Sequence, residues 1–144
     1  MNKAKVNEYL PIAIVALKKC GIADEKDRII STYRSNISSF GAAVTMGSFK
    51  AAVAFFSADA KDDNSKVSRS KLIQAMDFVV HGKGEDDKPR DVKIICAEVI
   101  ETNDDKALCE KYINASIGLK LAMNVYYLYD PNKEDGNGKS SSAV

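Results

Sequence analysis

A helix–glycine–helix pattern between residues 33 and 56 most strongly restricts what this chain can fold into. Apolar side chains recur there in steps of three and four residues, and the resulting stripe consists of Ile30, Tyr33, Ile37, Phe40 and Val44. This spacing fits one buried face of a helix and excludes a strand. Gly47 ends that segment, and Ser48 is suited to cap the next one.

The segment that follows, Phe49–Phe56, carries a single charge at Lys50. We therefore expect a short third helix that lies centrally in the hydrophobic core. Nothing between Tyr33 and Phe56 resembles a catalytic arrangement, so the segment indicates a role in packing and binding.

Local signals divide the first part of the chain into two helices. Residues 2–20 have helical apolar spacing, with Pro11 predicted to bend the helix and Gly21 to stop it. Asp24 is a suitable N-cap for the second helix, and Glu25 and Asp27 would lie in its first turn, where the helix dipole favours acidic residues.

The middle of the chain alternates between polar segments and helices. Residues 59–67 are predicted to be a polar loop, and Ser68 to cap a fourth helix. Residues 82–90 have the composition of a mobile linker. Val92–Ile100 is rich in β-branched residues, but we see no second strand to pair with it. We therefore expect a short fifth helix that is opened by Asp91.

The last predicted helix begins after Asn103 and runs to about Asp130, where Pro131 ends it. A helix of about 27 residues spans roughly 40 Å, more than a domain of this size needs. It carries two apolar faces, one for the core and one for a partner. The first is Leu108, Tyr112, Ala115, Leu119, Ala122, Tyr126 and Tyr129, and the second is Ile113, Ile117, Leu121, Val125 and Leu128.

These elements predict an all-α fold, a compact single-domain bundle of about six helices without β architecture. A chain of 144 residues suits one domain, which we place at residues 1–130, followed by a disordered polar tail at 131–144. Three cysteines without metal spacing (Cys20, Cys96 and Cys109) and the lack of a long apolar stretch indicate a cytoplasmic protein with reduced thiols and no membrane partner.

Sequence motifs for catalysis are missing, so we expect no enzyme, no cofactor, no metal and no small-molecule substrate. His81 is the single histidine and follows a predicted helix, where a histidine commonly meets the dipole. The acidic runs Glu85–Asp87 and Asp104–Asp105 could in principle hold Mg²⁺, but an acidic linker and a helix start explain them without a metal.

Basic residues are better candidates for function than acidic ones. The net charge is only +1, but residues 1–72 hold 12 Lys and Arg against 7 Asp and Glu, whereas residues 73–144 hold 9 against 13. Solvation explains such asymmetry, and so does a basic face or attraction between copies. The candidate RNA-binding residues are Lys18, Lys19, Arg34, Lys50, Arg69, Lys71 and Lys120.

The run from Tyr33 to Phe56 resembles the small subunit of the type III-B CRISPR–Cas effector, the Cmr complex. Members of that family have a Tyr-Arg-Ser-like start, an apolar helix, a glycine break and an Ala/Phe-rich segment. The flanks Tyr9–Ile14 and Arg69–Leu72 agree with the family as well. The resemblance covers residues 5–130 and departs in the last helix, where Gly118–Ala122 replaces a Trp-Leu-Lys-like element.

The resemblance implies a non-catalytic all-α subunit in antiviral defence, of which several copies stack beside the other Cmr subunits and the guide RNA–target RNA duplex. In that role the basic side chains would contact RNA phosphates without reading bases. A stand-alone helical adaptor is the alternative, in which the terminal helix binds a protein partner and no nucleic acid is involved.

Overall fold

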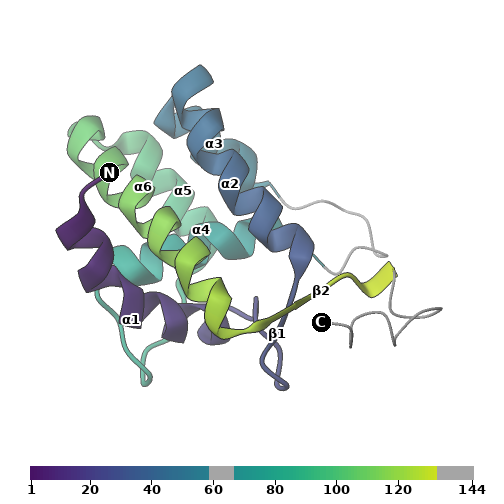
Figure 1. Ribbon diagram of the computed structural model, residues 1–144. Coiled ribbons are helices and arrows are strands. Elements are labelled where there is room, and N and C mark those ends of the chain that lie inside the picture. Colours follow the sequence, from purple (N-terminus) through teal and green to yellow (C-terminus); the bar gives the residue numbers. More distant parts are fainter. Residues whose placement is uncertain (59–66, 133–144) are drawn as a thin grey trace.

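Six α-helices and two short strands form the part of the chain that the computed structural model describes, residues 1–58 and 67–132 (Figure 1). The predicted all-α bundle of about six helices is confirmed. The elements are α1 (Lys3–Lys19), β1 (Arg28–Ile30), α2 (Ser31–Met46), α3 (Phe49–Ser57), α4 (Arg69–Val80), α5 (Val92–Glu101), α6 (Asp105–Ala122), the 3₁₀ turn η1 (Met123–Val125) and β2 (Tyr127–Tyr129). Most of the predicted loop 59–67 and of the predicted tail lies outside the described residues.

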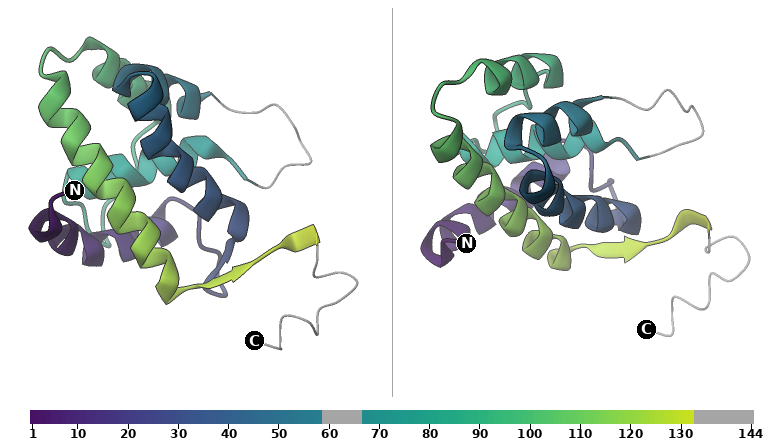
Figure 2. Two further views of the ribbon diagram at one scale, coloured as in Figure 1. Left: turned by 45° about the horizontal axis from the view of Figure 1, so that its top comes forward. Right: turned by 90° about the horizontal axis from the view of Figure 1, so that it is seen from above.

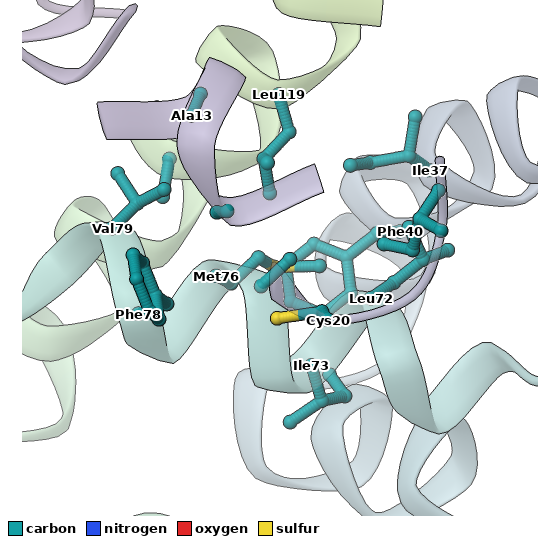
Figure 3. Close-up of a cluster of buried hydrophobic side chains, with 14 of the residues drawn as sticks. Ala13, Cys20, Ile37, Phe40, Leu72, Ile73, Met76, Phe78, Val79 and Leu119 are labelled. Carbon is teal, nitrogen blue, oxygen red and sulfur yellow. The ribbon is translucent and has the colours of Figure 1, made fainter. Parts of the chain in front are cut away.

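Helix α4 lies at the centre of the hydrophobic core. Its side chains Leu72, Ile73, Ala75, Met76, Phe78 and Val79 are fully buried. They meet Ala13 of α1, Phe40 of α2 and Leu119 of α6 around α4 (Figure 3). The expectation that α3 occupies this position is wrong. Helix α3 buries one face only, because Ala51, Ala54 and Phe55 face solvent.

Local capping signals determine where most helices begin and end. The N–H of Gly21 donates to the carbonyl of Lys18, and the N–H of Ile22 to that of Leu17, which is the hydrogen-bond pattern of a Schellman ending. Gly21 has φ 76°, a conformation that costs glycine little and other residues more. At the N-termini, Ser48 accepts from the N–H of Ala51 and Asp91 from that of Lys93, as predicted.

The second helix begins later than predicted, at Ser31 and not after Asp24. The carboxylate of Asp24 accepts from the backbone N–H of Lys26 and of Arg28, both at 2.9 Å, and from the Arg28 Nε at 3.0 Å. Asp24 therefore satisfies a tight turn and not a helix start, because its donors lie two and four residues further on, around the turn at Glu25 and Lys26. The β-branched Ile29 and Ile30 then continue as strand β1.

The last helix ends earlier than predicted, at Ala122, and Asp104 caps it in place of Asn103. With η1 it spans 21 residues. The chain then turns away because the Tyr126 hydroxyl donates to the Ile14 carbonyl at 2.7 Å and the Tyr127 N–H to the Asp27 carbonyl at 2.9 Å. Contacts with distant parts of the chain thus replace the next helical turn.

Strands β1 and β2 pair in parallel, with Arg28, Ile29 and Ile30 opposite Tyr127, Leu128 and Tyr129. This small sheet, which joins the segment after α1 to the segment after α6 at one end of the bundle (Figure 2), corrects the prediction of a fold without β structure. Arg28 also lies over the ring of Tyr129, 4.6 Å from its centroid. The sheet therefore fixes the end of α6 relative to the start of α2.

Candidate nucleic-acid interface

Arg34 on α2 and Lys120 on α6 are brought together although 86 residues separate them. The Arg34 Nη1 donates to the Asn124 Oδ1 at 3.0 Å and lies 3.4 Å from the Lys120 carbonyl oxygen. Both basic side chains are half-buried. Within the described residues neither forms an ion pair with a carboxylate. Where α2 packs on α6, the two side chains therefore carry positive charge without a carboxylate partner in the described part of the chain.

Lys18 and Lys19 do not form a comparable pair. The Lys18 ammonium lies 2.7 Å from the Asp27 Oδ1, and this hydrogen bond raises the pKa of Lys18. Its charge is thus neutralised locally. Lys19 is exposed at the end of α1. Of these two candidates, only Lys19 keeps a charge that is open to a ligand.

Lys50 and Lys71 hold the ends of other segments. The Lys50 Nζ donates to the Thr102 carbonyl at 3.1 Å, at the C-terminus of α5. The Lys71 Nζ reaches the Gly21 carbonyl at 3.5 Å, after the end of α1. Cations are favourable at helix C-termini because the unpaired carbonyls carry partial negative charge. These contacts explain the positions of both lysine side chains without an RNA ligand.

Arg69, the first residue of α4, stacks on an aromatic ring. Its Cζ lies 4.6 Å from the centroid of Phe55 at the end of α3. Its buried Nε has no hydrogen-bond partner. The candidate residues therefore occupy several separate places, and within residues 1–58 and 67–132 Lys19, Arg34, Lys120 and Arg69 have no carboxylate partner.

The sequence did not indicate the most extensive polar network, which joins α4, α5 and α6. Asp77 is 1% exposed, and the Arg90 guanidinium donates to both its carboxylate oxygens at 2.8 and 3.1 Å. Two further bonds of 2.8 Å join Arg90 to Glu98 on α5. These bonds raise the pKa of Arg90 and lower that of Glu98. The only available signal was an acid, Asp77, in the midst of an apolar helix.

Two more side chains border this network. The Tyr112 hydroxyl lies 3.4 Å from the Asp77 Oδ1, and burial is the main cause that raises its pKa. His81 ends α4, and its Nδ1 lies 2.9 Å from the Asp77 carbonyl oxygen and 3.1 Å from the Asp77 Oδ1. Because Arg90 bonds to both carboxylate oxygens and Tyr112 lies beside one of them, the arrangement is suited to holding three helices together.

A partly exposed apolar face lies on the last helix and the segment after it. Ile113 and Ile117 are half-buried, whereas Leu121 is 47%, Val125 62% and Leu128 39% exposed. The predicted second apolar face thus reaches solvent only toward its C-terminal end. Beyond Ala122 its members no longer lie on an α-helix.

Other chemistry is sparse in the described part of the chain. No three His, Cys, Asp or Glu side chains gather there as metal ligands. Asp87 accepts from the Gly84 N–H and Asp104 from the Ala107 N–H, so these acids serve a turn and a helix cap. Across residues 1–58 and 67–132, no helix combines the length and the apolar character that crossing a bilayer requires.

The three thiols are free, and Cys20 is the most buried of them. Burial raises its pKa to about 12. At neutral pH we expect native Cys20 to react with iodoacetamide roughly a thousand-fold more slowly than an ordinary exposed thiol, because the thiolate is the reactive form. Mass mapping of alkylated peptides measures this rate, with half-buried Cys96 as the internal comparison.

The same shift predicts an alkaline loss of stability. The neutral thiol is favoured in the folded state, so its contribution is complete below pH 9 and is lost as the pH rises toward about 12. A Cys20→Ala variant should lose less stability over this range. Equal native alkylation of Cys20 and Cys96, or identical alkaline unfolding of variant and wild type, would contradict the assignment.

No protein-family model, no curated protein and no solved structure matches the chain.

Proposed function

We propose that this protein is a non-catalytic small subunit of a type III-B CRISPR–Cas (Cmr) ribonucleoprotein in antiviral defence. In this role several copies stack beside the guide RNA–target RNA duplex, with the other Cmr subunits, and contact the RNA backbone. The observation that supports it most is the pair Arg34–Lys120, two basic side chains without a carboxylate partner among the described residues.

The order of elements is consistent with this role. The run that resembles the Cmr small subunit covers α2 and α3 with the glycine break at Gly47 between them. Arg34, at the start of that run, is held by its bond to Asn124 and so points toward the end of α6. A cation held in place loses less side-chain entropy on binding a phosphate than a free one does. The exposed Leu121, Val125 and Leu128 offer an apolar surface for a neighbouring subunit.

The test is purification of the tagged full-length protein from the cells that make it. We expect guide RNA and a larger backbone subunit to co-purify. The Arg34→Gln/Lys120→Gln variant should carry less RNA, whereas Lys106→Gln/Lys111→Gln, which removes two exposed charges from the same helix, should not. RNA binding should weaken with salt by roughly 0.7 logarithmic units per decade for each single-strand phosphate contacted. A salt-insensitive affinity would contradict the proposal.

A stand-alone helical adaptor is the second candidate, supported by the exposed side chains of Leu121, Val125 and Leu128. It predicts one protein partner without RNA in the same purification. Val125→Asp should then abolish capture of that partner, because a charge cannot be desolvated at an apolar contact without cost. Loss of RNA in the Arg34→Gln/Lys120→Gln variant would exclude this candidate.

A further inference from the structure

Phe55 is largely exposed to solvent, although it lies next to a fully buried phenylalanine in the same helix. It is 59% exposed in the last turn of α3, whereas the adjacent Phe56 is 2% exposed and packs at 5.4 Å against Phe40. An exposed phenyl ring forgoes the hydrophobic stabilisation that burial would supply. Its face is, however, suited to stacking on another planar group.

The guanidinium of Arg69 already lies over this ring, with 4.6 Å between its Cζ and the ring centroid, whereas the ring of Phe56 meets it edge-on at 6.0 Å. Arg69 begins α4, where the helix dipole disfavours a cation. Its Nε is buried without a hydrogen-bond partner. Within the described residues no carboxylate forms an ion pair with it. Among residues 1–58 and 67–132 the arrangement therefore lacks an anion.

We propose that Phe55 and Arg69 form a stacking site for an unpaired nucleotide of RNA. The base would stack on the ring and guanidinium planes, and Arg69 would donate to the phosphate. Proteins recognise single-stranded RNA by such aromatic and arginine stacking, whereas a duplex hides its base faces. This inference rests on the proposed RNA-binding function and adds to it a preference for unpaired over paired RNA.

The site is separate from Arg34 and Lys120, because it lies between the end of α3 and the start of α4 and not between α2 and α6. The two places therefore make independent predictions. Variants at Arg34 and Lys120 should weaken the binding of single-stranded and duplex RNA alike. Variants at Phe55 and Arg69 should weaken the binding of single-stranded RNA selectively.

The experiment measures binding of the full-length protein to fluorescein-labelled oligouridine and to a duplex RNA of equal length, by anisotropy at low salt. Phe55→Leu keeps an apolar side chain without a stacking face, and Arg69→Lys keeps the charge without the planar group. Each should bind oligouridine about 5- to 100-fold more weakly, the range that loss of one stacked base produces. Phe55→Tyr should bind like the wild type, and so should the control Met46→Leu, which changes another exposed apolar side chain.

Because Phe55 is largely exposed, Phe55→Leu should unfold at the same temperature as the wild type, which separates lost binding from lost folding. If the wild type prefers oligouridine and both variants lose that preference, the stacking site is supported. If the wild type binds RNA but Phe55→Leu and Arg69→Lys bind equally well, the stacking site is wrong and the proposed function stands. If the wild type binds neither RNA and none co-purifies with it, the proposed function fails, and the inference with it.

Discussion

Replacing Arg90 by methionine is expected to lower the free energy of unfolding by about 3–5 kcal/mol. Arg90 makes two hydrogen bonds to the carboxylate of Asp77, which is 1% exposed. Methionine fills similar space but leaves that carboxylate buried without the guanidinium, with only the Tyr112 hydroxyl at 3.4 Å and the His81 Nδ1 at 3.1 Å as side-chain contacts among the described residues. The loss follows from the charge that remains, not from the charge that is removed.

Urea unfolding measures the effect, and two further variants test its origin. Glu98→Gln removes the exposed partner of Arg90, so it should cost less than about 1 kcal/mol. The double variant Asp77→Leu/Arg90→Met removes the buried carboxylate together with its half-buried cation and should recover much of the lost stability. An equal loss in Arg90→Met and Glu98→Gln would show that the buried carboxylate does not depend on Arg90.

Truncation of Phe40 to alanine is expected to cost about 3–5 kcal/mol. Phe40 is fully buried between α2 and α4, and its ring meets that of Phe56 edge-to-face with centroids 5.4 Å apart. Alanine leaves a cavity that neighbours fixed in three helices cannot fill. The ring pair adds about 0.5–1.5 kcal/mol to the loss of burial.

Phe55→Ala is the matched control, since it removes the same atoms from a ring that is 59% exposed. We expect it to cost less than about 1 kcal/mol, mostly through the lost contact with Arg69. Thermal and urea unfolding of both variants measure the difference. If the two truncations cost the same, the assignment of Phe40 to the core and Phe55 to the surface is incorrect.

Residues that act on their near neighbours could be interpreted correctly from the sequence. Gly21 ends α1, Ser48 starts α3 and Asp91 starts α5, each through hydrogen bonds that span only a few residues. The stripe of α2 from Tyr33 to Phe40 is buried as its spacing predicts. Asp24 shows where such interpretation fails, because the same carboxylate can accept hydrogen bonds at a helix start or in a tight turn.

The candidate site was less predictable than the fold. The sequence names seven basic candidates but not their partners: in the structure Lys18 is neutralised by Asp27, and Lys50 is bound to the Thr102 carbonyl. Arg90 was interpreted only as part of a linker, although it holds Asp77. The partners of a long side chain depend on which elements pack together, and no local pattern records that.

The sequence by itself determined the helices, because hydrophobic spacing and capping act within a few residues along the chain. Only the tertiary structure decided which of the adjacent Phe55 and Phe56 is buried, and that β1 pairs with β2. It alone also brought Arg34 beside Lys120. These outcomes depend on contacts between segments far apart in the chain, and packing selects among arrangements that the local pattern leaves equally possible.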